Sequence, residues 1–135
     1  MLDEYPRMNF FIRNLGNSQW RVREESAEAL GEIGDKKAVE PLIKCLNDID
    51  WHVREAAALS LGILDDPRAL KPLLNMLDDE KDSVRYGAVL SLSSVGDDSA
   101  LKQLENAAKD ESLMVRQIAE FAIAEIEKKM ELVSE

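Results

Sequence analysis

The sequence predicts an all-helical fold, a solenoid of four helical hairpins with about 31 residues each. A short phrase returns four times at a constant spacing, and apolar residues within each copy recur every three or four positions. Glycine and proline are few, with 6 and 4 among 135 residues. Repetition at a fixed step is typical of proteins whose units pack only on their neighbours. We therefore expect one domain over residues 1–135, with repeats at about 1–34, 35–65, 66–96 and 97–130.

The repetition is anchored on a valine followed by an arginine. With a step of 31 residues and no insertion, the pair occurs at Val22-Arg23, Val53-Arg54, Val84-Arg85 and Val115-Arg116. Five positions before the valine stands an asparagine or an aspartate, at Asn17, Asp48, Asp79 and Asp110. Eight positions after it stands a leucine or an isoleucine. Four copies in one register indicate that every unit has the same backbone arrangement.

The first helix of each unit is indicated by AVEPLIKCL from Ala38 and ALKPLLNML from Ala69, in which apolar residues recur every three or four positions. Aspartates are good N-caps, and Asp35, Asp66 and Asp97 mark the start of the first helix in the second, third and fourth units. Prolines fall further inside, at Pro41 and Pro72. A proline inside a helix usually bends it, so the first helices are predicted to be kinked.

The second helix of each unit begins near the anchor valine. In the second unit its apolar or small positions form one stripe, consisting of Val53, Ala57, Ser60, Leu61 and Leu64. A single hairpin cannot bury two such helices alone, so the hairpins must stack. The last unit places Gln103, Glu105 and Glu120 in columns that are apolar, small or proline elsewhere. This substitution predicts a solvated carboxyl-terminal cap.

Composition excludes several classes of partner. The chain has 27 acidic and 17 basic residues and a formal net charge of -10, so a nucleic acid or an anionic membrane surface would be repelled. Its apolar runs are far shorter than the roughly 20 residues that span a membrane. The opening MLDEYPR does not resemble a secretory signal, and the lone Cys45 forms no internal disulfide. We expect a cytoplasmic protein.

The repeated units resemble HEAT repeats, in particular the subtype called PBS-lyase HEAT-like repeats. The resemblance is carried by GDKKAVEPLIKCLNDIDWHVREAAALSLG and by the related segments GNSQWRVREESAEALGEIGD and DDPRALKPLLNMLDDEKDSVRYGAVLSLSSVGD. The resemblance covers nearly the whole chain. It implies a right-handed α-α superhelix whose second helices line the concave side. It says little about activity, because most such proteins bind other proteins and a minority are enzymes or enzyme subunits.

The repeated acid and arginine lie six positions apart and are predicted to be structural. In the resembled family, such residues form a ladder that links successive repeats. A planar guanidinium can bridge carboxylates or loop carbonyls of two layers at once. The predicted ladder consists of Asp48, Arg54, Asp79, Arg85, Asp110 and Arg116, with Asn17 and Arg23 at its start.

Catalytic groupings are missing from the sequence pattern, so we expect no enzyme activity, no metal and no cofactor. Family members that hydroxylate a modified lysine carry repeated His-Glu pairs, whereas His52 is the single histidine and has no glutamate beside it. Family members that act on DNA line the concave side with basic residues, whereas this chain places glutamates there. Cys45 shares a column with Met76 and Ala107, which indicates the core. Family members that act on bilins are longer chains that work in pairs, so an accessory role in such an enzyme remains the alternative.

Apolar residues on the expected outer side of the second helices predict a binding surface. Six positions after the anchor valine, where solvent is expected, the copies carry Glu28, Leu59, Leu90 and Phe121. Some of these side chains could instead pack on a neighbouring helix, and self-association is a third alternative. The predicted partner-binding set is Trp51, His52, Leu59, Ile63, Tyr86, Leu90, Phe121, Glu24 and Glu28. The predicted function is therefore a non-catalytic scaffold that binds a basic partner or an amphipathic helix.

Overall fold

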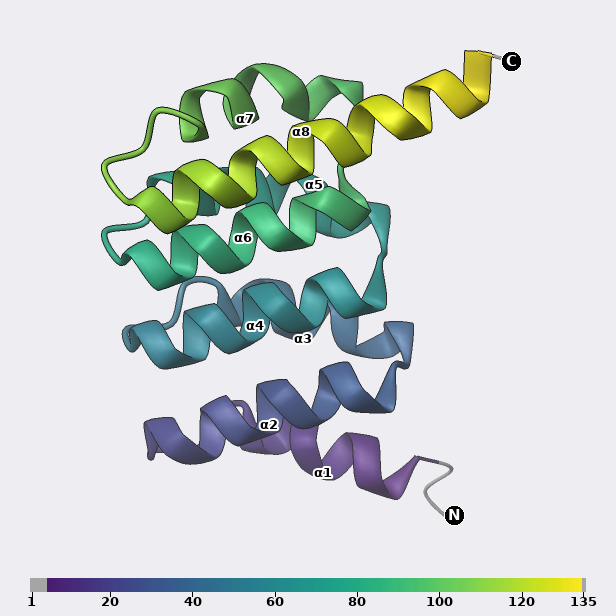
Figure 1. The fold of residues 1–135 in the computed structure, drawn as a ribbon. Coiled ribbons are helices and arrows are strands. Elements are labelled where there is room, and N and C mark those ends of the chain that lie inside the picture. Colours follow the sequence, from purple (N-terminus) through teal and green to yellow (C-terminus); the bar gives the residue numbers. More distant parts are fainter. Residues whose placement is uncertain (1–4, 135) are drawn as a thin grey trace.

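A computed structural model describes residues 5–134, and every regular element in this range is a helix (Figure 1). The predicted all-helical fold is confirmed. The first four residues of the predicted first repeat, and Glu135, lie outside the described residues. No helix within the described range is both long and apolar enough to cross a bilayer.

The helices form two layers. One layer holds the first helices, which are α1 (Pro6–Asn14), α3 (Val39–Cys45), α5 (Leu70–Asn75) and α7 (Leu101–Ala107). The other holds the second helices, which are α2 (Trp20–Ile33), α4 (Trp51–Leu64), α6 (Asp82–Val95) and α8 (Leu113–Ser134). In Figure 1 the second helices lie side by side in front, in chain order, and α8 extends beyond the others. We call the outer side of this front layer the second-helix face.

A short 3-10 helix opens the second, third and fourth hairpins. These turns are η1 (Lys36–Ala38), η2 (Pro67–Ala69) and η4 (Asp98–Ala100), and a further one, η3 (Met76–Asp78), follows α5. The predicted aspartate caps are present at all three opening turns. Asp35 accepts a hydrogen bond from the main-chain N–H of Lys37 at 2.8 Å, and the caps at Asp66 and Asp97 have the same form. These caps satisfy N–H groups that would otherwise lack a partner.

The interrupted first helices do not depend on proline. Pro41 and Pro72 lie in the first turn of α3 and α5, where a missing N–H group removes no hydrogen bond of the α-helix. The fourth hairpin has the same 3-10 turn followed by an α-helix, although Gln103 replaces the proline. The break between the two parts is therefore a property of every such hairpin, and proline is compatible with it rather than its cause.

Neighbouring second helices approach closely at glycine. A Cβ atom added to Gly31 would lie 2.8 Å from Ser60 Cβ, and one added to Gly62 would lie 2.7 Å from Ser91 Cβ, so neither site has room for a side chain. The serines use this proximity: Ser60 Oγ donates to the carbonyl of Ala27 at 2.7 Å, and Ser91 Oγ donates to the carbonyl of Ala58 at 2.6 Å. We call these two contacts the Gly-Ser seam.

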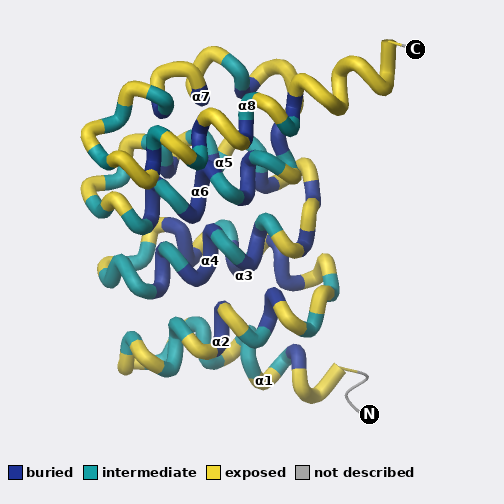
Figure 2. The backbone as a smooth tube through the Cα atoms, viewed as in Figure 1, coloured by how far each residue is buried: buried dark blue, intermediate teal, exposed yellow. Residues whose placement is uncertain are grey.

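The core lies between the two layers and runs through all four repeats. Its largest fully buried side chains include Leu30, Leu61 and Leu92, one from each of the first three second helices. Figure 2 shows buried residues concentrated in the stacked helices, whereas the protruding end of α8 is exposed. The polar residues Gln103, Glu105 and Glu120 of the fourth hairpin are exposed.

Candidate functional site

The arginine of each of the first three repeats is paired with the aspartate of the next repeat. Arg54 donates through Nε to Asp79 Oδ2 at 2.9 Å and through Nη2 to Asp79 Oδ1 at 3.1 Å. Arg23 with Asp48 and Arg85 with Asp110 repeat this bidentate geometry. Each pair is largely buried, and the carboxylate also accepts the main-chain N–H two residues ahead. Charge-assisted bidentate pairs are among the stronger hydrogen bonds in proteins.

Within one repeat, the arginine binds the aspartate's main chain rather than its carboxylate. Arg54 Nη1 donates to the carbonyl of Asp48, six residues earlier, at 2.9 Å. Arg116 makes the equivalent bond to Asp110 at 2.8 Å, but no carboxylate of the described chain lies within ion-pair distance of it. The spacing of six residues therefore corresponds to a hydrogen bond between the arginine and a main-chain carbonyl of its own repeat. The ion pair joins the arginine to the carboxylate 25 residues later.

A groove lies on the second-helix face between α2 and α4. Its volume is about 450 Å³. The α2 wall is acidic and consists of Glu24, Glu28 and Glu32, spaced one turn apart. The α4 wall is mainly apolar and consists of Trp51, His52, Glu55, Ala56, Leu59, Ser60 and Ile63. Because the lining residues extend over about two turns of α2 and about three turns of α4, the groove runs along the helices.

The acidic wall carries uncompensated charge. None of Glu24, Glu28, Glu32 and Glu55 forms an ion pair with a described residue of the chain. Partial burial raises the pKa of Glu28, and the negative charges of Glu24 and Glu32, followed by those of Glu25 and Glu55, raise it further. The groove is thus a place where an added positive charge lowers the electrostatic energy.

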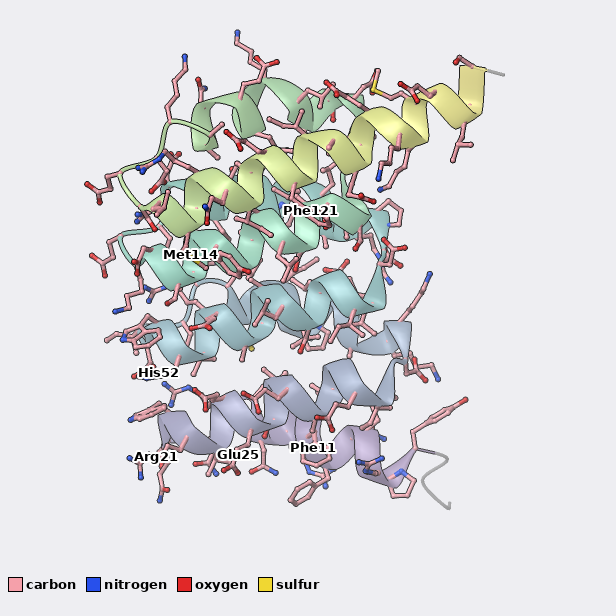
Figure 3. All side chains as sticks on the ribbon, in the orientation of Figure 1. Phe11, Arg21, Glu25, His52, Met114 and Phe121 are labelled. Atoms are coloured by element: carbon pink, nitrogen blue, oxygen red, sulfur yellow. The ribbon has the colours of Figure 1, made fainter. Side chains whose placement is uncertain are left out.

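An aromatic stack closes the end of the groove where the helices begin. The His52 ring stacks on Trp51, with centroids 3.6 Å apart, and on Trp20, with centroids 4.3 Å apart. Two cations extend the stack, because Arg21 lies over Trp20 at 5.3 Å and Lys81 lies over Trp51 at 4.3 Å. Figure 3 shows His52 and Arg21 at this same end of the helix layer.

Asp50 fixes the position of His52 in this stack. Its Oδ1 accepts the main-chain N–H of His52 at 2.8 Å and lies 2.9 Å from His52 Nδ1. Burial alone would raise the pKa of Asp50, but the two hydrogen bonds with His52 outweigh it and lower that pKa. Because the histidine is held by Asp50 and by two rings, it forms a rigid end wall.

The next junction on the same face is filled. The Leu59 side chain packs over Gly87 of α6, at a distance of 3.5 Å from a Cβ atom placed there. The corresponding pair between α2 and α4 is Glu28 and Ala56, and both line the groove. A leucine over a glycine closes the surface between two helices, whereas a glutamate directed to solvent leaves it open.

The structure brings together six residues of the predicted partner-binding set. Trp51, His52, Leu59, Ile63, Glu24 and Glu28 all line the groove. Tyr86 lies in a smaller, neighbouring hollow of about 210 Å³ that also contains Met114 and shares Glu55 with the groove. Leu90 is half-buried and Phe121 is 47% exposed, and neither lines either hollow. Figure 3 shows Phe121 midway along α8, well away from His52.

Sequence reasoning omitted Trp20 from the site. The signal was available, because Trp20 and Trp51 occupy the same column, two positions before the anchor valine. The cations Arg21 and Lys81 were also omitted, and no spacing in the sequence distinguishes them from other surface cations. Among the described residues, no group of three or more histidines, cysteines, aspartates and glutamates is arranged to hold a metal ion. Burial raises the pKa of the Cys45 thiol to about 11, as expected for a core residue.

The stacked helical hairpins, joined by repeated arginine-aspartate pairs, place this chain in the class of α-helical repeat proteins. The model of HEAT repeats matches residues 9–92 and 66–124, and the chain belongs to the HEAT-repeat family. The predicted family is thus confirmed. No functionally curated protein matches the sequence.

Solved structures with similar folds include one from the complex of CpcE and CpcF of phycocyanin lyase from Nostoc sp. PCC7120, with a TM-score of 0.81 and 29% identity. That similarity covers 91% of this chain and 53% of the other, so the chain spans about half the length of this relative. Human deoxyhypusine hydroxylase is similar with a TM-score of 0.77 and 21% identity, over 93% of this chain and 45% of the other. An engineered protein is similar with a TM-score of 0.66 and 21% identity, over 90% and 62%. At 21% identity, the last two show the fold alone.

Proposed function

We propose that the chain is a non-catalytic protein-interaction module that binds a partner on its second-helix face. The observation that carries the proposal is the groove between α2 and α4, where two apolar side chains, Leu59 and Ile63, lie outside the buried core. Ile63 is 65% exposed, and Leu59 does not pack against the buried core cluster. Apolar side chains that remain accessible beside a hollow are typical of interaction surfaces.

The charge of the groove supports a basic protein partner. Four glutamates surround it, and the whole chain has a formal net charge of -10. Like charges on a partner would be repelled, and a basic segment would be attracted and would associate faster. The similarity to a chain from a two-protein complex is also consistent with a protein partner.

Affinity capture with a matched pair of variants tests this function. Ile63→Glu places a charge in the groove at an exposed position, so the fold is retained and proteins captured by the wild-type chain are lost. Ile49→Glu is the control, because Ile49 is 93% exposed and lies outside the groove. Circular dichroism confirms that both variants are folded. Equal capture by the two variants, or no capture by the wild-type chain, would contradict the proposal.

A subunit role in a lyase-type enzyme is the second candidate. It is favoured by the 29% identity to a chain of the phycocyanin lyase complex, which exceeds the identity to the other two structures. Titration of the purified chain with a bilin, followed by absorption spectroscopy, separates the candidates. An unchanged spectrum supports the interaction module, and a saturable spectral shift supports the lyase-type role.

A further inference from the structure

The length of the groove limits what can occupy it. Both α2 and α4 have 14 residues, which corresponds to about 21 Å of helix. The residues that line the groove run from Glu24 to Glu32 on α2 and from Trp51 to Ile63 on α4, which corresponds to about 12 and about 18 Å of helix. The groove has about 450 Å³ of space, enough for several side chains but not for a whole helix. An occupant therefore lies lengthwise, with its backbone outside the groove and one row of side chains inside.

The chemistry of the walls favours a helix over an extended chain. An extended segment exposes main-chain N–H and C=O groups that require partners. The apolar wall, at Ala56, Leu59 and Ile63, offers no such groups, and the carboxylates opposite can only accept hydrogen bonds. A helix satisfies its own main chain, so it can lie against an apolar wall without leaving polar groups unpaired.

The spacing of the glutamates matches a helical occupant. Glu24, Glu28 and Glu32 are four residues apart on α2, which places them about 6 Å apart along the axis. Basic residues three or four positions apart on a second helix have nearly the same rise, so each can face one carboxylate. On the other wall, Leu59 and Ile63 are also four residues apart and would contact apolar residues on the adjacent side of that helix.

We infer that the groove receives an amphipathic helix of a partner protein, which lies lengthwise between α2 and α4 with a row of basic residues facing Glu24, Glu28 and Glu32. This inference rests on the proposed function and adds the partner's conformation and the direction in which it lies. The partner does not cross the repeats along the row formed by Leu59, Leu90 and Phe121. The helix ends at the wall formed by Trp51 and His52.

A synthetic peptide tests the inference. The probe has 14 residues, the length of α2, with lysines and leucines each recurring every three or four positions on adjacent sides of a helix. The control peptide has the same composition in scrambled order. Both tryptophans of the chain belong to the aromatic stack, so intrinsic fluorescence reports binding, and isothermal titration calorimetry measures the affinity. We expect the patterned peptide to bind at least about tenfold more tightly than the scrambled one.

Two triple variants with the same change in charge locate the site. Glu24→Gln, Glu28→Gln and Glu32→Gln together should weaken binding by about tenfold or more. Glu105→Gln, Glu120→Gln and Glu127→Gln together remove three exposed carboxylates outside the groove and should change affinity by less than about twofold. Equal weakening by both triples, or equal binding of both peptides, would overturn the inference.

The same measurements separate this inference from the proposed function. If Leu90→Glu and Phe121→Glu abolish binding and the groove triple does not, the partner crosses the repeats, and the lengthwise helix is wrong although the second-helix face still binds. If Ile63→Glu and Ile49→Glu capture equal amounts of protein, or the wild-type chain captures none, the proposed function itself is wrong.

Discussion

The α2–α4 and α4–α6 junctions have the same backbone arrangement and differ on one side only. Both contain a bidentate arginine-aspartate pair, Arg23 with Asp48 and Arg54 with Asp79. Each also contains one contact of the Gly-Ser seam. On the second-helix face, however, the first junction is an open acidic groove, and the second is covered by Leu59.

The difference shows that the contacts between successive repeats and the shape of the second-helix face depend on separate columns of the repeat. The residues that join successive repeats are the same at these two junctions because the geometry of the join is the same. The residues that open or cover the second-helix face, Glu28 with Ala56 and Leu59 with Gly87, belong to neither the ion pair nor the Gly-Ser contact, so they differ while those contacts stay the same. Each variant below changes one set of columns and leaves the other intact.

Removal of a ladder arginine should have the largest effect on stability. Arg54→Ala deletes a pair that is largely buried and leaves the Asp79 carboxylate without its cation. We expect a loss of about 3 kcal/mol in the free energy of unfolding, measured by urea denaturation. Arg116→Ala is the control, because Arg116 donates to main-chain carbonyls but has no ion pair in the described chain, and it should cost about 1 kcal/mol or less. Equal losses would show that the inter-repeat pair contributes nothing.

Two glycine-to-alanine substitutions should have effects of opposite sign. Gly62→Ala forces a Cβ atom to within 2.9 Å of Ser91 Cα, which is main chain and cannot rotate away, so we expect a loss of about 1–3 kcal/mol. Gly87→Ala places its Cβ atom at an ordinary contact distance of 3.5 Å from Leu59 and improves helix propensity. It should stabilise the chain by up to about 1 kcal/mol. Thermal denaturation of both variants measures the difference, and destabilisation by Gly87→Ala would show that Leu59 needs more room than its position indicates.

The smallest effect concerns the acidic wall and depends on pH. The pKa of Glu28 is raised in the folded chain, first by burial and then by its acidic neighbours. A carboxyl group whose pKa is higher in the folded chain than in the unfolded chain stabilises the fold when it is protonated. This stabilisation is complete at pH values below the pKa in the unfolded chain, about 4.3, and is lost as the pH rises through the pKa in the folded chain. Glu28→Gln should therefore stabilise the chain by about 0.5 kcal/mol at pH 7 and not at pH 3.5.

The control for this prediction is Glu127→Gln, which removes an exposed carboxylate outside the groove. Its melting temperature should match that of the wild-type chain at both pH values. A destabilising effect of Glu28→Gln at pH 7 would show that Glu28 supports the fold, and the acidic wall would then have a structural explanation.

The fold was predictable because stacking repeats the same contacts. Val53 and Leu61 are fully buried, and their columns kept one register through four copies, so both the period and the helical face could be inferred. The 3-10 turns were not predicted, because three residues are too few for a period to appear. Proline does not explain the break predicted at Pro41, because the fourth hairpin has the same local geometry without a proline.

Part of the lining of the groove was predictable from the sequence, but the shape of the groove was not. The columns identified Leu59 and Glu28 as residues on the outer side, and the structure places both at the groove. The groove itself depends on what lies opposite each side chain on the next helix, which is Ala56 for Glu28 and Gly87 for Leu59. Such pairings across helices depend on axial offsets and side-chain directions that a single sequence does not specify.

The ladder also determines how such a chain can change in length. Each rung joins an arginine to the aspartate 25 residues ahead, so loss of residues 66–96 as a whole would place Arg54 opposite Asp110 in the same geometry. Loss of any fraction of that segment would leave the two groups out of register. The loss of one whole repeat therefore keeps the ladder in register, whereas a change in the length of a single repeat does not.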